Sequence, residues 1–243
     1  MKKSIFGMLL MMEGLFLGFC TLVAFYYHQK IGEQDWQAFA WTTVITFLSG
    51  ALLTAYGHTR LGRRDKQLSR GGSFIIVGLT WVVFSVFGML PFILYDGLDV
   101  DFASAYFETM SGFTTMGATI IPDIEAMPHG ILLWRSLMQW MGGLGIVVFS
   151  FAMLPVRDMK NSTMFIAEMS GLTINRLQPK IGATSRRLLL IYIVLTLLCI
   201  FMFWVGPMNL FDALCYALST TATGGFGTHT ASIGYFHSAY IEY

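Results

Sequence analysis

The sequence predicts an all-α membrane protein, a polytopic helical bundle with re-entrant loops, and three observations support this fold class. Hydrophobic residues make up 55% of the 243 positions and charged residues only 12%, whereas soluble domains carry about 25% charged residues. Five apolar segments are long enough to cross a bilayer, and two others, each followed by a Gly/Thr-rich stretch, are too short. Basic residues gather in three segments that would face one side of the bundle.

Each spanning segment is about as long as a bilayer requires, since about 20 helical residues cover a hydrocarbon core of about 30 Å. Lys2 and Lys3 precede a first segment that is too long for the apolar region of a signal peptide, so we expect a retained helix. The five segments are residues 4–27, 38–57, 73–95, 129–154 and 186–205.

The positions of the charges predict the orientation. Of the 15 Lys and Arg residues, 13 lie before the first segment, between the second and third, or between the fourth and fifth. Basic loops favour the cytoplasm, so we expect a cytoplasmic N-terminus. The opposite loops are acidic, and this pattern holds only if residues 102–119 enter the membrane and return to the same face. The net charge of +1 predicts no nucleic-acid partner.

The two short apolar segments belong to an internal repeat. Residues 111–117 align with residues 219–225 at a constant offset, so that Thr115 matches Thr223 and Gly117 matches Gly225. We therefore expect four parts: two leading transmembrane helices with a basic cytoplasmic loop (1–72), a first pore repeat (73–156), a cytoplasmic linker (157–185), and a second, incomplete pore repeat (186–243).

The Gly/Thr-rich stretches are candidates for binding a cation through the backbone. Extended backbone at membrane depth is tolerated where it lines a watery cavity, and rings of carbonyls can replace the hydration shell of potassium. Glycine permits the torsions that this requires, and the short helices would point their negative C-terminal ends at the ion. One such stretch is usually a plain turn, but two at matched positions favour a filter. The candidate filter residues are Thr114, Thr115, Met116, Gly117, Ala118, Ala222, Thr223, Gly224, Gly225 and Phe226.

Three longer motifs carry a family resemblance: ETMSGFTTMGAT at 108–119, LWRSLMQWMGGLGI at 133–146 and STTATGGFGTHTASIGYF at 219–236. They resemble the first pore loop, the following inner helix and the second pore loop of the TrkH-type subunits in the Trk/Ktr/HKT superfamily of potassium transporters. The resemblance covers essentially the whole chain, including the two leading helices. It implies repeats of outer helix, pore helix, filter and inner helix, with four such repeats around each pore.

The resemblance also implies potassium uptake across the bacterial inner membrane, either passive or by symport. Potassium would be the substrate, and no covalently bound cofactor is implied. The expected partners are a second copy of the chain in a homodimer, the surrounding membrane lipid, and a cytosolic TrkA-type nucleotide-binding regulatory subunit on the basic side.

The sequence departs from the family pattern in two respects. Met116 stands where the family often has a small or hydroxylated residue, although its carbonyl could still face an ion. Repeats three and four are not in these 243 residues, which favours a fragment of a longer gene product over two chains that complete one pore. The alternative function is therefore a truncated, non-conducting fragment or scaffold. The spans offer no pair of catalytic groups at one depth, so an enzyme is not expected.

The expected inner helix carries a charge and three glycines. Arg135 lies about one turn inside it, where a charge is costly and usually paired. We expect a structural ion pair between Arg135 and Glu108 behind the filter, with extension of Arg135 to the outer surface as the alternative. Gly142, Gly143 and Gly145 could form a gating hinge, but close helix packing is the favoured interpretation.

Three further polar residues have open interpretations. Glu13 could relay protons or ions, but it is more simply protonated or bonded to a neighbouring helix. Asp212 could concentrate cations at the pore mouth, although we favour a cap at the start of its helix. His229, beyond the second candidate filter, is expected to face water.

Overall fold

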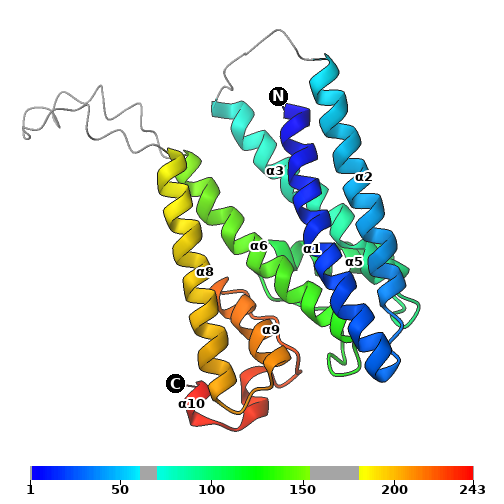
Figure 1. The fold of residues 1–243 in the computed structure, drawn as a ribbon, viewed down its shortest axis with the longest axis vertical. Helices are drawn as coiled ribbons and strands as arrows, with labels where there is room; N and C mark the ends of the chain where they lie inside the picture. Colours follow the sequence, from blue (N-terminus) through cyan, green and yellow to red (C-terminus); the bar gives the residue numbers. More distant parts are fainter. Residues whose placement is uncertain (1, 61–69, 154–180, 243) are drawn as a thin grey trace, which may run out of the picture.

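The computed structural model describes residues 2–60, 70–153 and 181–242, and within these ranges every regular element is a helix, as predicted. Helices α1 (Lys2–Ile31) and α2 (Trp36–Arg60) form an antiparallel hairpin (Figure 1). Their backbones approach closely because small residues face each other. A Cβ on Gly50 would lie 2.8 Å from the carbonyl oxygen of Gly7, so no larger residue fits between them.

The predicted span at 73–95 is divided into α3 (Arg70–Gly88) and the short α4 (Leu90–Leu94). Pro91 stands in the first turn of α4, and a proline has no backbone N–H to donate to the preceding turn. The break falls at the level of the first pore helix, because a Cβ on Gly88 would lie 2.9 Å from the side chain of Thr109.

The next segment enters the bundle and returns to the side where it began. Helix α5 (Phe102–Phe113) starts at Asp101, whose carboxylate accepts the N–H of Ser104 (3.1 Å), and α6 (His129–Met153) follows after an irregular stretch. The backbone N–H of His129 donates to Glu33 in the α1–α2 turn (3.1 Å). At the other end of the segment, α4, which precedes α5, packs against α2. Both ends of the segment therefore lie beside the α1–α2 hairpin, as a re-entrant loop requires.

The second half repeats this plan. Helix α8 (Ile181–Val205) leads to α9 (Leu210–Thr221), a 12-residue helix like α5 and displaced from it by the predicted offset. After the second Gly/Thr stretch come the 3₁₀ helix η3 (Ser232–Phe236) and α10 (Ala239–Glu242). In Figure 1, α8 and α9 descend beside the tilted α6, away from the α1–α2 hairpin.

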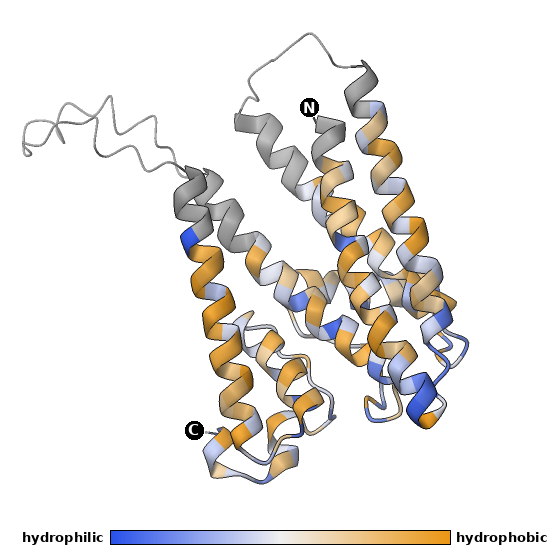
Figure 2. Ribbon diagram, in the orientation of Figure 1, coloured by the Kyte–Doolittle hydropathy of each residue, from blue (hydrophilic) through white to orange (hydrophobic). Residues whose placement is uncertain are grey.

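The helix surfaces agree with a lipid environment. Within the described residues, three helices are long and apolar enough to cross a membrane, namely Phe6–Ile31, Trp36–Tyr56 and Arg187–Val205, and Gly78–Leu94 is a shorter apolar helix. Figure 2 shows apolar residues covering α1, α2 and α8. The chain is therefore a multi-pass membrane protein. Most of the predicted basic loop between the second and third spans, and most of the predicted linker at 157–185, lie outside the described residues.

Helix α6 forms the centre of the buried core. Trp134 is completely buried, packs edge-to-face on Phe113 of α5, and donates its indole N–H to the carbonyl of Gly88 (2.9 Å). On the other side, the indole N–H of Trp140 donates to Thr196 of α8 (3.0 Å). Because α6 contacts α1, α5, α8 and α9, it can position both Gly/Thr stretches at once.

Candidate functional site

The two Gly/Thr stretches leave their helices by the same turn. In the first, the N–H of Met116 donates to the carbonyl of Ser111 (3.0 Å), and the equivalent atoms of the second loop, Gly224 and Ser219, are 2.9 Å apart. In each turn the preceding residue donates a second bond. The N–H of Thr115 donates to the carbonyl of Gly112 (3.0 Å), and the N–H of Thr223 donates to the carbonyl of Thr220 (2.9 Å). This pair of bonds defines a Schellman motif, which places its next-to-last residue in the left-handed region.

A threonine occupies the left-handed position in both motifs. The φ angle is 56° at Thr115 and 55° at Thr223, where glycine is the usual residue because a branched side chain is strained. Two positions further on, Gly117 and Gly225 have φ angles of 76° and 92°. The residues between these positions, Met116 and Gly224, do not have positive φ angles. The two loops therefore share an alternating and strained backbone, of a kind that clusters at functional sites.

The two loops also touch. A Cβ on Gly117 would overlap the carbonyl oxygen of Gly224, so the contact requires glycine at this position for space as well as for its torsion. The contact brings the centres of two stretches that are distant in the sequence side by side.

The candidate filter residues differ in exposure. In the first loop, Thr114, Met116 and Ala118 are exposed, and Thr115 and Gly117 are half-buried. The side chain of Met116 is 66% exposed, so it does not block its own backbone. In the second loop, exposure alternates: Thr223 and Gly225 are exposed, whereas Ala222, Gly224 and Phe226 are buried.

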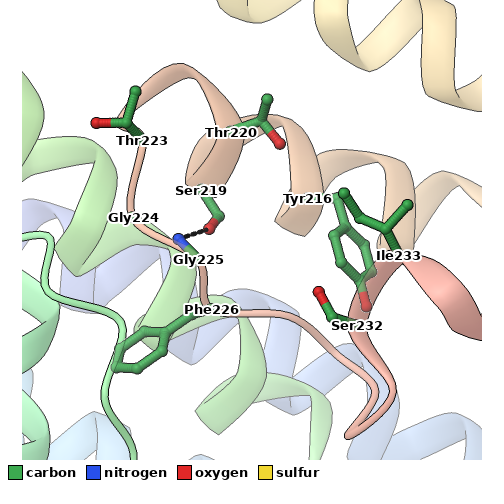
Figure 3. A pocket seen from close by; sticks show the side chains of 9 residues that line it. All are labelled: Tyr216, Ser219, Thr220, Thr223, Gly224, Gly225, Phe226, Ser232 and Ile233. Atoms are coloured by element: carbon green, nitrogen blue, oxygen red, sulfur yellow. Dashed lines mark hydrogen bonds between the residues drawn. The ribbon is translucent and has the colours of Figure 1, made fainter. Parts of the chain in front are cut away.

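The second loop borders a cavity of about 270 Å³. Figure 3 shows that Thr223, Gly224, Gly225 and Phe226 line it from one side, with Ser232 and Ile233 of η3 opposite. The hydroxyl of Ser219 accepts the N–H of Gly225 (3.0 Å), which ties the loop back to its own helix.

The structure brings Glu108 and Arg135 into contact. Arg135 Nε donates to Glu108 Oε1 at 2.8 Å, and each side chain is only 1% exposed, so Arg135 does not extend to the surface. Glu108 also accepts the hydroxyl of Thr119 and the N–H of Ile120, both at 2.9 Å. The pair thereby fastens the end of the first loop to its pore helix.

Arg135 reaches the second loop as well. Its Nη1 donates to the carbonyl of Gly227 (3.3 Å), and its guanidinium lies 4.2 Å from the centre of the Phe226 ring. A single buried side chain of α6 therefore contacts both loops. Gln139, one helical turn further along α6, also contacts the second loop, and the sequence interpretation did not identify it. Its spacing of four residues from Arg135 was the available signal, since such residues share a helix face.

The glycines of α6 are packing positions. A Cβ on Gly142 would overlap the carbonyl of Phe113 at the end of α5, and a Cβ on Gly143 would lie 3.1 Å from Ala222 at the end of α9. Close packing therefore accounts for both residues. A Cβ on Gly145 would lie 3.2 Å from the ring of Trp81.

The predictions for Asp212 and His229 need correction. The residue that caps α9 is Asn209, whose side chain accepts the N–H of Asp212 (2.8 Å), while the carboxylate of Asp212 accepts the hydroxyl of Thr228 (2.7 Å). The side chain of His229 is only 16% exposed. It stacks on Tyr235 with ring centres 3.6 Å apart, so it does not simply face water.

Glu13 is fully buried in α1, and its carboxyl oxygens have no hydrogen-bond partner among the described residues. Of the two simpler interpretations, protonation or a bond to a neighbouring helix, the described residues do not form the bond. Among all the residues that the structure describes, no group of three or more His, Cys, Asp or Glu residues could hold a metal ion. The cysteines Cys20, Cys199 and Cys215 are unpaired.

Comparison with known proteins identifies the family of the chain. The sequence model of the TrkH family, described as a cation transport protein, matches residues 36–243. The Trk system potassium uptake protein TrkH of Halomonas elongata is 40% identical over 243 residues, which are 100% of this chain and 49% of that protein. The protein of the same name in Salmonella typhimurium is 39% identical over 223 residues, which are 91% of this chain and 44% of that protein.

A solved structure is similar in fold. The crystal structure of the potassium transporter TrkH from Vibrio parahaemolyticus matches with a TM-score of 0.76 and 34% identity, over 98% of this chain and 47% of that chain. This chain thus spans about half the length of the relatives it matches. The family consists of transporters rather than enzymes. A model match over most of the chain and identity near 40% establish that the chain belongs to the TrkH family of cation transport proteins.

Proposed function

We propose that this chain supplies two filter loops of a Trk-type system that takes up potassium across the bacterial inner membrane. The observation that carries the proposal is the paired backbone of the loops, which share one strained turn and meet where Gly117 contacts the carbonyl of Gly224. The potassium uptake named for the relatives agrees with this chemistry.

In this mechanism the protein binds the ion through main-chain oxygens. Positive φ angles at alternate residues rotate successive peptide planes, so that neighbouring carbonyls can face the same side. Residues 114–118 and 222–226 would then replace part of the hydration shell of potassium. The C-terminal ends of α5 and α9, where each loop begins, carry partial negative charge that favours a cation. No covalent step is involved.

The Glu108–Arg135 pair has a positional role in this mechanism. A buried ion pair contributes little net stability because both charges lose their hydration, but a break in the pair leaves an uncompensated charge. The pair instead fixes the geometry of the site, because its two side chains make five polar contacts that join α5, α6 and both loops. Since the two charges cancel, Arg135 would not repel a cation in the filter.

The wider assembly follows the same proposal. Residues 73–156 and 186–243 would act as the first and second pore repeats, with the N-terminus in the cytoplasm. Two copies would form a homodimer in the membrane, and a TrkA-type regulatory subunit would bind the basic cytoplasmic side. The apolar faces of α1, α2 and α8 support the membrane location.

Growth at low potassium tests the function. A bacterium that lacks its own potassium uptake systems would carry the reading frame that contains this chain, as wild type, as Gly117→Ala or as Gly78→Ala. We expect the wild type to restore growth and Gly117→Ala to abolish it, because a Cβ at position 117 overlaps a carbonyl. Gly78→Ala is the matched control, since nothing lies within 4 Å of its Cβ position. Failure of the expressed wild type would contradict potassium uptake.

A further inference from the structure

Gln139 lies directly behind the second loop. Its side chain is completely buried, and its Oε1 accepts the hydroxyl of Ser219 (2.7 Å) and the N–H of Phe226 (3.1 Å). Ser219 belongs to the last turn of α9, and Phe226 ends the candidate filter stretch. One side-chain oxygen from α6 therefore joins the last turn of α9 to the final residue of the second filter stretch.

The orientation of the Gln139 amide follows from its partners. A backbone N–H can only donate, so the group that faces Phe226 must be the oxygen. Because the hydroxyl of Ser219 donates to this oxygen, its lone pairs are free to accept the N–H of Gly225 (3.0 Å; Figure 3). The amide thereby acts through Ser219 on Gly225, the residue with a φ angle of 92°.

The packing of the second loop also depends on Gln139. A Cβ on Gly224 would overlap the side-chain amide of Gln139, so the backbone of the second loop rests directly on this group. On its other side, the carbonyl of Gly224 contacts Gly117 of the first loop. The backbone of the second loop at Gly224 therefore contacts both the amide of Gln139 and the first loop. A change in the size or polarity of residue 139 would shift the second loop relative to the first.

The first loop has a different arrangement. Ser111, which corresponds to Ser219 in the repeat, donates its hydroxyl to the carbonyl of Ala118 within its own loop (2.6 Å). The contact through Gln139 therefore passes from the inner helix of one repeat to the filter stretch of the next.

The two ends of the Gln139 amide differ in their environment. The Nε2 has no hydrogen-bond partner among the described residues, and a buried donor without an acceptor is unfavourable. A leucine of similar volume would avoid that cost, but it would leave the hydroxyl of Ser219 and the buried N–H of Phe226 without their acceptor.

We propose that Gln139 is a positioning residue for ion selectivity, through which the inner helix of the first repeat sets the conformation of the second filter stretch. This inference rests on the proposed function and deepens it, because it assigns discrimination between cations to a side chain that never touches the ion.

Selectivity measurements on the complete gene product in proteoliposomes test the proposal. Potassium and sodium fluxes would be measured for the wild type, Gln139→Leu, Gln139→Glu and, as a control for the same substitution at an exposed position, Gln37→Leu. We expect Gln139→Leu to raise the ratio of sodium to potassium flux about tenfold, an effect that the loss of its two hydrogen bonds to Ser219 and Phe226 can supply. Gln139→Glu keeps the acceptor oxygens, so it should retain most of the selectivity, and Gln37→Leu should match the wild type.

The outcomes separate the two claims. A folded Gln139→Leu protein with the wild-type flux ratio would overturn the role of Gln139 and leave potassium uptake intact, whereas a wild type without potassium flux would contradict both. If Gln139→Leu does not reach the membrane, Ser219→Ala decides the matter. Ser219→Ala should raise the ratio of sodium to potassium flux, as we expect for Gln139→Leu. Its control is Ser136→Ala, because the hydroxyl of Ser136 donates to the carbonyl of Leu132 within α6, and this variant should keep the wild-type ratio. Equal flux ratios for the two serine variants would overturn the proposal.

Discussion

At the scale of single residues, the site depends on side chains in positions that their own preferences disfavour. Thr115 and Thr223 occupy the left-handed position of a Schellman motif, although glycine would relieve the strain. Such strain persists only where the surrounding structure maintains it. The repetition of the same exception in both loops is what we expect if the threonines serve the conformation of the proposed filter rather than the stability of the fold.

Replacement of Thr223 by glycine should therefore stabilise the protein while it weakens ion discrimination. We expect the free energy of unfolding to rise by about 1 kcal/mol, since a left-handed conformation costs a non-glycine residue about that much. Thermal unfolding in detergent would measure the gain. Thr220→Gly is the control, because Thr220 is exposed in the last turn of α9 and should lose a few tenths of a kcal/mol. A Thr223→Gly protein less stable than the wild type would contradict the strain.

Arg135 allows a second prediction at this scale. Arg135→Leu leaves the carboxylate of Glu108 buried without its partner, and we expect a loss of about 3–5 kcal/mol in the free energy of unfolding. The double variant Glu108→Gln with Arg135→Leu removes the unpaired charge and should recover part of that loss. Chemical denaturation in detergent would compare the two proteins. Equal stability of the single and double variants would show that the ion pair does not carry the effect.

At the scale of elements, the α1–α2 turn is joined to the start of α6 by acidic side chains. Glu33 accepts the backbone N–H of His129 (3.1 Å) and lies 2.7 Å from its Nδ1. Asp35 is completely buried against Gly130, and burial and the charge of Glu33 raise its pKa to about 6. The leading hairpin, which forms neither loop, is thus connected to the helix that positions both.

The raised pKa of Asp35 predicts a pH dependence. Because the folded state holds this proton more tightly than the unfolded chain, its contribution to stability is complete below about pH 4 and is lost as the pH rises through about 6. Asp35→Asn should therefore stabilise the protein at pH 7.5 by about 1–3 kcal/mol and change little at about pH 3.5. Melting temperatures of wild type and variant across this range would measure the difference.

Glu33, His129 and Tyr95 are the titratable groups near Asp35, and a control tests whether the loss of any outer carboxylate would produce the same effect. Asp99→Asn removes an exposed carboxylate elsewhere in the outer loops and should leave the pH profile of the wild type unchanged. A profile for Asp35→Asn that runs parallel to the wild type at every pH would contradict the assignment.

The elements themselves were largely predictable. Helix α5 occupies residues 102–113, as its apolar length and the Gly/Thr stretch after it indicated, and α9 follows at the repeat offset. Local pattern could not fix features that depend on tertiary contacts. Gln139 looks like any polar residue in a helix until Ser219 and Phe226 are found against it. The sequence pattern predicted a solvated His229 because its stacking partner, Tyr235, lies in the short 3₁₀ helix η3, which has no apolar periodicity to predict the contact.

At the scale of the whole molecule, the described residues form two matched helix-and-loop units that meet around α6. The charge pattern predicted the re-entrant loop before any contact was known, because the outer loops could be acidic only if residues 102–119 returned to the same face. The break at Pro91 was missed, since hydropathy averages over a proline that interrupts the hydrogen bonding of a helix. If the proposed function is correct, cation binding is a property of the two loops together.

Direct location of the ion tests this central claim. Crystals of the complete gene product grown in rubidium, a potassium substitute with anomalous scattering, would show where the cation binds. We expect anomalous density beside the carbonyl oxygens of residues 114–118 and 222–226, and its loss in Gly117→Ala. Anomalous density in the membrane region that lies away from both loops, and that persists in Gly117→Ala, would contradict the account.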